Sequence, residues 1–245
     1  MAEASAALSR EFAPTGTLRA SINLGNPVLA HSHTAAEKPA GVTLDLSREF
    51  ARALGVPVSF LLFDGAAKSV AALASGQADI GFMAIDPQRA ETTHFTPAYV
   101  QIEGVYLVAQ DSPIRSNEEV DHAGIRIVVG QGSAYGLYLA RNIHKASLVQ
   151  VPTSEEVVDA MLQGGLEVAA GVRQQMEADA QRVGSGVRLL DGRFMVIRQA
   201  MAMPKGRSAE AAAFLDAFVA RMKSTGVVAQ ALERHGILGA QVAQD

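Results

Sequence analysis

The stretch "LASGQADIGFMAIDPQRAETTHFTPAYV" (Leu73–Val100) decides the fold. Its segment Ala78–Ile85 is almost continuously apolar, and strands of this kind are typical of a parallel sheet that helices cover on both faces. The segment before it, Ala66–Gly76, is rich in small residues and predicts a helix that ends at the glycine. A helix followed by a fully apolar strand predicts an α/β fold.

The same alternation extends upstream of this stretch. Thr17–Leu24 alternates apolar and polar residues and predicts a strand, which ends in a Gly-Asn-Pro turn. Leu44–Gly55 has apolar residues at helical spacing, with a glycine where a helix C-cap belongs. Val56–Phe63 then predicts the next strand. The first part of the chain therefore predicts a complete strand-helix-strand-helix-strand unit.

A second unit of the same order follows. The expected elements are a strand at 124–130, a helix at 133–144, a strand at 147–152, a helix at 153–165 and a strand at 166–172. Ser116, with Glu119 three residues on, has the spacing of a capping box and predicts a brief helix before this unit. Two consecutive units of this kind imply either two sheets or one doubly wound sheet.

Two long segments can connect the units. Tyr99–Pro113 leads out of the first unit, and Asp191–Gly206 is a matching return strand. The chain then ends in a helical tail with Ser208 as N-cap and a break at Gly226. This path predicts two lobes around a cleft. We expect residues 1–103 and 198–245 in lobe one and 104–197 in lobe two.

Composition excludes several classes of function. Of the 245 residues, 49% are hydrophobic and 19% are charged, with a net charge of −4, which indicates a folded globular protein. Lysine and arginine are scattered singly, so nucleic acid is not an expected partner. The chain has no cysteine, and no apolar run approaches the ~20 residues that span a bilayer. We expect a monomer without membrane insertion.

Arg89 raises a question that spacing alone leaves open. Asp86 and Pro87 suit the N-cap and first turn of a helix that starts after the apolar strand. Arg89 then falls in the first turn, where the helix dipole disfavours a cation. One reading is an exposed, solvated arginine, and the other is a bidentate clamp on a carboxylate.

The segment "VVGQGSAYG" (Val128–Gly136) follows a strand and opens a helix. It differs from a dinucleotide fingerprint by one extra residue between the last two glycines, and no acid ends the next strand. The N–H groups of Ser133, Ala134 and Tyr135 could still bind a small anion at the helix start. The alternative is that Ser133 only caps its own helix.

No familiar catalytic or phosphate-binding motif is present. His31 and His33 form an H-x-H pair, but no Asp, Glu or Cys stands at ligand spacing beside them. We therefore expect no metal and no cofactor.

One combination of residues resembles a known family. The usual patterns of its members are G-x-x-x-D-L-A, L-x-x-G-x-x-D and T-x-x-R-x-x-x-x-x-F-x-x-P-Y, and the residues that fill those places here are Gly41, Asp45, Leu46, Leu73, Gly76, Asp79, Arg89, Phe95, Pro97 and Tyr99. From about Thr17 to Gly236 the chain resembles family 3 extracellular solute-binding proteins, the polar amino-acid receptors of ABC importers. The resemblance implies an α/β, two-lobed type II periplasmic binding protein-like fold that closes on a small solute.

The resemblance also implies a binding site. In the family, an arginine matching Arg89 and a helix start matching "GQGSAYG" hold the carboxylate of the solute; here Ser133 and Ala134 replace two threonines. The strand matching Leu166–Val172 usually ends in an acid that pairs with the ligand ammonium, but here it ends in Val172, followed by Arg173. Arg173 either adds a second anionic contact or points outward. The expected ligand-binding residues are Asn23, Asn26, Ala84, Arg89, Ser133, Ala134, Tyr135 and Arg173.

Three functions remain open. The first is a substrate-binding protein of an ABC importer, partnered by a permease, that binds a carboxylate-bearing solute without the usual ammonium pocket. The second is a dehydratase acting on prephenate-like or arogenate-like acids, with Glu103 or Asp86 as general acid. The third, more remote, is the sensing domain of a regulator. The family implies a periplasmic location, but Met1–Ala20 does not resemble a signal peptide, so a cytoplasmic location is also open.

Overall fold

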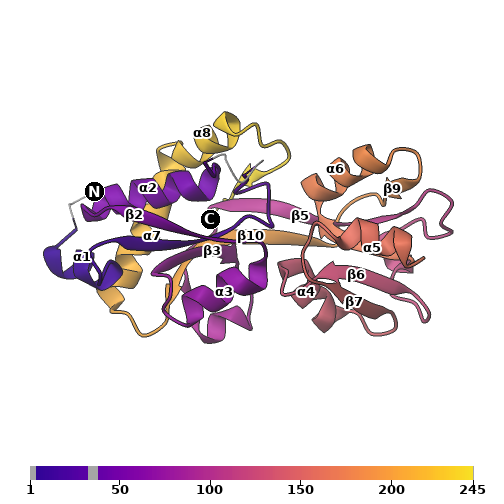
Figure 1. Cartoon of the computed structure of the whole chain (residues 1–245), viewed down its shortest axis with the longest axis horizontal. Coiled ribbons are helices and arrows are strands. Elements are labelled where there is room, and N and C mark those ends of the chain that lie inside the picture. The colour runs from indigo at the N-terminus through magenta and orange to yellow at the C-terminus, as the bar shows by residue number, and fades with distance from the viewer. Residues whose placement is uncertain (1–3, 33–37, 245) are drawn as a thin grey trace. The chain divides into compact units, whose positions relative to one another are not determined.

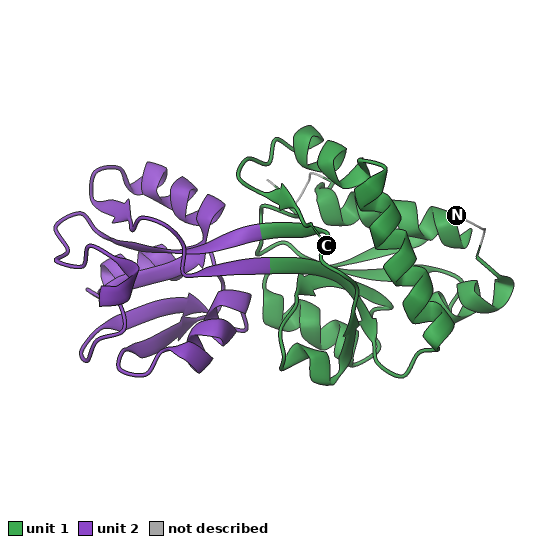
Figure 2. Cartoon of the chain, turned by 180° about the vertical axis from the view of Figure 1, so that it is seen from behind, with its two compact units in different colours: residues 1–101, 198–245 green, residues 102–197 purple. Residues whose placement is uncertain are grey.

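The computed structural model describes residues 4–32 and 38–244. The chain divides into two compact units, coloured separately in Figure 2. Unit 1 is Met1–Gln101 with Arg198–Asp245, and unit 2 is Ile102–Ile197.

Unit 1 is built on parallel strands in the order β2-β1-β3, with β10 antiparallel to β3. β1, β2 and β3 form where the sequence predicts them, and every residue of β3 is buried. Two short strands, β4 and β11, pair with β10 and β5. The bounds are β1 Leu18–Asn23, β2 Val58–Phe63, β3 Ile80–Ala84, β4 Thr93–Phe95, β5 Val100–Ala109, β10 Met195–Pro204 and β11 Gln241–Val242.

Helices cover both faces of these strands. In Figure 1, α2 and α8 lie on one side of the unit 1 strands and α3 on the other, as a nearly all-apolar central strand requires. The bounds are α1 Ala6–Phe12, α2 Val42–Leu54, α3 Ala66–Ala74, α7 Ala209–Ser224 and α8 Val227–Arg234. Gly55 ends α2 with a φ of 68°, and the Oγ of Ser208 accepts the N–H of Ala211. Both predicted helix caps are confirmed.

An aromatic cluster joins three helices of unit 1. The ring of Phe50 on α2 lies 4.9 Å from Phe12 of α1 and 4.9 Å from Phe218 of α7, measured between ring centroids. All three side chains are buried, and edge-to-face pairs of this kind add to the free energy gained from burial alone. This contact explains the helix α1, which the sequence pattern did not predict.

Unit 2 repeats the arrangement with its own core. β6 pairs in parallel with β7 on one side and with β8 on the other, and β5 runs antiparallel to β8. A cluster including Val128, Met161 and Met176 fills its interior. The bounds are β6 Arg126–Gly130, α4 Ala134–Asn142, β7 Ser147–Val151, α5 Val157–Gln163, β8 Val168–Val172, α6 Arg173–Val183 and β9 Val187–Leu189.

One predicted cap is wrong. A 3-10 turn does occupy Asn117–Glu119, but the Ser116 side chain makes no capping hydrogen bond to it. The carboxylate of Glu119 accepts the backbone N–H of Arg115 instead, at 2.7 Å.

β5 and β10 each carry residues of both units, and both ribbons change colour along their length in Figure 2. The two long segments predicted to connect the lobes are therefore strands. Within the described part of the chain, no helix has the length and apolar character needed to cross a bilayer.

Asp121 holds a turn of unit 2 and should make stability depend on pH. Its carboxylate accepts the N–H groups of His144, Lys145 and Ala146 at 2.7–3.1 Å. These bonds, that of Ala146 foremost, lower its pKa from 3.8 to about 2. A lowered folded-state pKa stabilises the fold above the unfolded value, and this contribution disappears as the pH falls through the folded value.

We therefore expect Asp121→Asn to lower the free energy of unfolding at neutral pH. The difference from the wild type should hold down to about pH 4 and shrink as the pH approaches 2. Urea unfolding at a series of pH values measures it. A difference that grows on acidification would contradict the assignment.

Candidate functional site

The turn after β3 is organised by the Asp86 side chain. Its Oδ1 accepts the N–H groups of Gln88 at 2.9 Å and Arg89 at 3.4 Å. Asp86 therefore accepts backbone N–H groups, as a capping side chain would, but it is not the N-cap of a helix: the element that follows is a single 3-10 turn, η1 (Arg89–Glu91), whose N-cap is Gln88. The carboxylate fixes the backbone from which the Arg89 side chain leaves.

The reading of Arg89 as a solvated surface arginine is wrong. The residue is only 6% exposed, and its Nη1 donates to the carbonyl oxygen of Ala84 at 3.1 Å. Burying a guanidinium is costly unless polar or anionic groups surround it. Ala84, the last residue of β3, contributes its backbone oxygen to this cation.

Asn23 and Asn26 lie beside this turn in the topology. β1 ends at Asn23, and β1 and β3 are parallel neighbours, so the segments after both strands leave the same edge of the sheet. The Oδ1 of Asn23 accepts the N–H of Gly25 at 3.0 Å and shapes the turn. The Oδ1 of Asn26 is buried and has no hydrogen-bond partner among the described residues. A buried acceptor of this kind calls for a donor.

At the start of α4, Ser133 has the capping role, one of the two that the sequence left open for it. Its Oγ accepts the N–H of Gly136 at 3.0 Å, so Ser133 does cap its helix. The N–H groups of Ala134 and Tyr135 are the first two of α4 and have no acceptor within a helix. The Tyr135 hydroxyl donates to Ser154 Oγ at 2.8 Å, and burial raises the pKa of this tyrosine. The Tyr135 side chain is thus engaged in unit 2, and its backbone N–H is the group suited to an anion.

Arg173 belongs to a cluster that the sequence did not reveal. Its Nε donates to Glu103 Oε2 at 2.6 Å, and Arg193 donates through Nη1 to Glu103 Oε1, also at 2.6 Å. The bonds from Arg193 and Arg173 hold the pKa of Glu103 below its ordinary value. β5 brings Glu103 to this place, and Phe194 N–H donates to Gly104 oxygen at 3.0 Å. No local motif signals this strand pairing, so spacing could not have identified Arg193.

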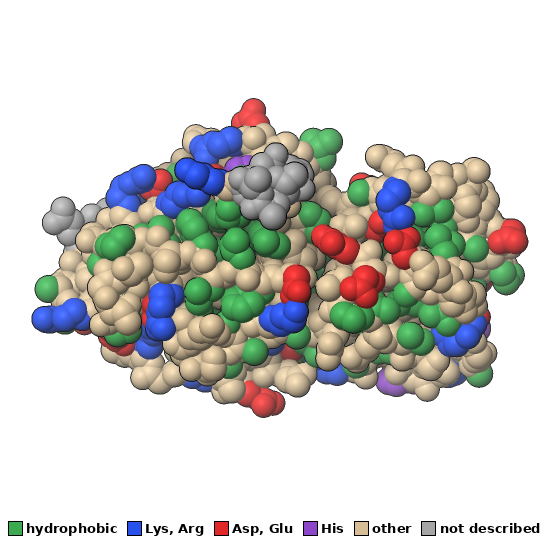
Figure 3. Space-filling model, in the orientation of Figure 1, with side chains coloured by type: hydrophobic (Ala, Val, Ile, Leu, Met, Phe, Trp, Pro, Cys, Tyr) green, Lys and Arg blue, Asp and Glu red, His purple; other side chains and the backbone are tan. Residues whose placement is uncertain are grey.

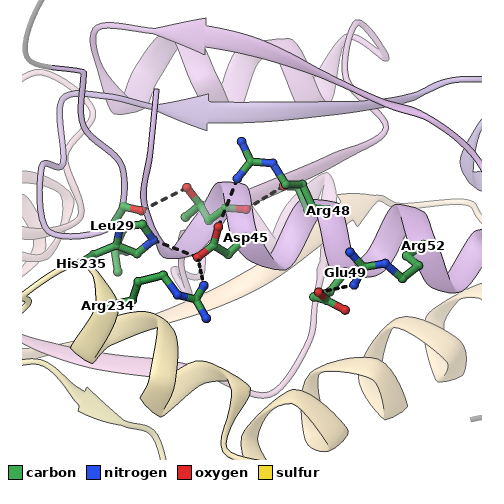
Figure 4. Close-up of polar contacts among 9 residues, drawn as sticks. Leu29, Asp45, Arg48, Glu49, Arg52, Arg234 and His235 are labelled. Atoms are coloured by element: carbon green, nitrogen blue, oxygen red, sulfur yellow. Dashed lines mark hydrogen bonds and ion pairs between the residues drawn. The ribbon is translucent and has the colours of Figure 1, made fainter. Parts of the chain in front are cut away.

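A second polar cluster lies on unit 1. Figure 4 shows the Asp45 carboxylate accepting from Arg48, Arg234 and His235, at 2.8–3.1 Å. His235 also meets His31 edge to face, with ring centroids 5.8 Å apart. His33, the other half of the H-x-H pair, is outside the described residues. No group of three or more metal-ligating side chains occurs among the residues that the structure describes.

Charges on one face of the molecule are mixed. On the face drawn in Figure 3, basic and acidic side chains are scattered among polar and apolar ones. A polyanion would need a continuous basic face, which this side of the molecule does not offer.

The chain was compared with models of protein families, with curated proteins and with solved structures. The family model described as bacterial extracellular solute-binding proteins, family 3, matches residues 23–237. No curated protein matches.

Solved structures provide matches of fold. A binding component of an ABC transporter from Wolinella succinogenes DSM 1740, complexed with lysine, has a TM-score of 0.75 at 22% identity, covering 89% of this chain and 95% of that one. The solute receptor for L-cysteine of Neisseria gonorrhoeae has a TM-score of 0.79 at 21% identity, covering 93% and 92%. An ancestral amino acid-binding protein, a precursor of cyclohexadienyl dehydratase, has a TM-score of 0.76 at 20% identity, covering 92% and 97%.

Proposed function

The chain belongs to the bacterial extracellular solute-binding proteins of family 3, and we propose that it binds a small carboxylate-bearing solute for import by an ABC transporter. The proposed ligand groups are Arg89, Ala84, Asn23 and Asn26 in unit 1 and Ser133, Ala134, Tyr135 and Arg173 in unit 2. A permease is the proposed protein partner, and the proposed place of action is outside the cytoplasmic membrane, where proteins of this family work.

The observation that carries the proposal is the burial of Arg89. Its guanidinium is held at the carboxyl end of a fully buried parallel strand, with Asp86 fixing the turn and Ala84 accepting one N–H. Ligands of open α/β sheets bind at this end of the strands. Arginine has a planar fork of donors that matches a carboxylate. The first two N–H groups of α4 offer a second place for the same negative charge.

The solute we propose lacks the usual recognition of an α-ammonium group. β8 ends in Val172, and the residue after it is an arginine. Glu103, a nearby acid in unit 2, is already bonded to two guanidinium groups. An ammonium placed there would meet cations, which is costly for a partly buried charge. Organic acids, and amino acids bound through other groups, therefore fit better than simple α-amino acids bound in the usual way.

The dehydratase alternative has support in the ancestral neighbour, but the two candidate acids are poorly suited to it. A general acid must carry a proton at the working pH, whereas the two arginines hold the pKa of Glu103 low. The Asp86 carboxylate is engaged with backbone N–H groups. We propose a binding protein without catalytic activity. Product formation from prephenate by the purified protein would reverse this ranking.

A matched panel of solutes tests the proposed function. Thermal unfolding is measured with amino acids and organic acids and, as controls, with the primary amide of each carboxylate. A true ligand at 100 times its Kd should stabilise the fold by about 2.7 kcal/mol and so raise the Tm. Its amide should have a much smaller effect, because it lacks the charge that Arg89 would bind. Equal shifts for acid and amide would contradict recognition of a carboxylate.

A further inference from the structure

We propose that Arg173 and Arg193 form a subsite for a second anionic group of the solute, and that Glu103 occupies this subsite as a built-in competitor. The inference rests on the proposed function and narrows it to a dianionic solute, such as a dicarboxylate. Arg193 and Glu103 then become residues that determine specificity.

The first support is the number of arginines per carboxylate in the cluster formed by Glu103, Arg173 and Arg193. Each oxygen of the Glu103 carboxylate is bonded to a different arginine: Oε2 to Arg173 Nε and Oε1 to Arg193 Nη1, both at 2.6 Å. Arg173 also donates through Nη2 to the carbonyl oxygen of Gly192 at 2.6 Å. Two guanidinium groups thus share one carboxylate.

A structural ion pair in the same unit shows a different arrangement. Arg126 donates to Glu167 through both Nε and Nη2, at 2.9 and 2.7 Å, so one planar fork binds one carboxylate bidentately. In the Glu103 cluster, neither arginine uses its fork in this way. The arrangement therefore retains capacity for another acceptor.

The charges around the cluster favour an anion. The three bonded groups carry two positive charges and one negative charge. Glu177 comes no closer than 3.8 Å to Arg173 Nη1, and its side chain is half exposed, so this contact is weak and screened by solvent. An anionic group is attracted to the cluster by this net positive charge, and the Glu103 carboxylate opposes it through charge repulsion.

Arg193 is the arginine that an incoming anion can reach. Its side chain is 54% exposed, and Glu103 is its one described side-chain partner, leaving Nη2 and Nε for a new acceptor. Arg173 and Glu103 are each only about a quarter exposed. We infer that the solute's second anionic group binds Arg193 and takes over part of the role of Glu103. Glu103 is ionised at neutral pH, as a glutamate of ordinary pKa is, and its two arginine partners lower its pKa further, so it opposes every anion that enters.

The competitor role predicts effects of opposite sign for two substitutions. Arg193→Ala removes an attraction and should weaken binding of a dicarboxylate about 10-fold or more, while leaving the monoamide of the same acid unaffected. Glu103→Gln removes the competing charge and keeps the side-chain shape, so it should strengthen dicarboxylate binding several-fold. If Glu103 merely positioned the arginines, Glu103→Gln would weaken it.

The test is titration calorimetry with malonate, succinate, glutarate and adipate, and with the monoamide of each. Glu167→Gln and Arg126→Ala are matched controls, because they break an ion pair of the same unit outside the cluster, and neither should change affinity. Thermal unfolding without solute verifies that each variant is folded.

The outcomes separate this inference from the proposed function. If a diacid and its monoamide bind equally well and Arg193→Ala changes neither, the subsite is refuted while carboxylate binding stands. Weaker dicarboxylate binding by Glu103→Gln refutes the competitor role. If no mono- or dicarboxylate binds the wild-type protein, the proposed function itself fails. A preference for one diacid that Arg193→Ala removes and Glu103→Gln increases supports the inference.

Discussion

Replacing Arg89 with alanine is expected to lower the affinity for the carboxylate solute by about 100-fold or more. The side chain is buried, and the turn from which it leaves is fixed by Asp86. Removing one partner of a buried, hydrogen-bonded charge pair costs about 2 to 5 kcal/mol, and about 2.7 kcal/mol corresponds to 100-fold. Titration calorimetry with the best ligand of the solute panel measures the loss.

Two further variants show whether the loss is specific. Arg89→Lys keeps the positive charge but loses the planar fork, so its affinity should fall between those of the wild type and the alanine variant. Arg52→Ala removes an exposed arginine of unit 1 that pairs with Glu49 and should bind normally. Because Arg89 also donates to Ala84, each variant is first checked for cooperative unfolding. A folded Arg89→Ala variant with unchanged affinity would remove this residue from the site.

The largest expected effect on stability is that of Asp79→Asn. This carboxylate is 1% exposed and accepts from Arg19 through Nε and Nη2 at 2.9 and 2.7 Å and through the backbone N–H at 2.9 Å. Arg207 Nη2 lies 3.5 Å from its Oδ1, and burial lowers the pKa of Arg207. Without the negative charge, two cations face each other with little solvent around Arg207.

We expect this substitution to cost about 3 to 5 kcal/mol of unfolding free energy, as when one partner of a buried ion pair is removed. Urea unfolding at neutral pH measures this loss as a lower urea concentration at the midpoint of unfolding, with an unchanged slope of unfolding free energy against urea concentration. Asp64→Asn is the matched control: Asp64 pairs with Lys68 on the surface at 2.7 Å, and exposed pairs contribute little. Equal stability losses for the two variants would show that burial of Asp79 is not the cause.

The buried strands were the most predictable part of the fold. β3 is apolar throughout and buried throughout, because a central parallel strand has no solvent-facing side. Gly55 and Ser208 were predictable as helix ends for an equally local reason, since a helix terminus must satisfy its backbone groups nearby. Local signals of this kind depend only on neighbouring residues.

Elements held by distant contacts were missed. α1 has seven residues, too few for a helix to be stable by itself in water, and it depends on Phe12 packing against Phe50. The burial of Arg89 was missed for a related reason: spacing places a residue on a turn but does not tell what covers it. The family pattern pointed to Arg89 where the helical pattern did not.

In the candidate site too, features set by neighbouring residues were predictable and features set by distant contacts were not. Ser133 as a cap could be predicted from its place before a helix, and the structure confirms that hydrogen bond. The cluster around Arg173 could not be predicted from the sequence, because Glu103 and Arg193 lie 70 and 20 residues away from Arg173 along the chain. Only the strand pairings of unit 2 bring these three charges together.

Unit 1 consists of two segments of the chain that are separated in sequence by unit 2. This separation affects the order in which the protein can fold during synthesis. β3 is bonded to β1 on one side and to β10 on the other, and β10 is made more than 100 residues after β3. Until then, one edge of an apolar strand has no partner, a state that favours pairing with other chains. Unit 2 is continuous in sequence, so all of its strands except the β10 segment emerge from the ribosome before unit 1 can close. We therefore expect unit 2 to fold first and the nascent first half of unit 1 to be the part most dependent on chaperones.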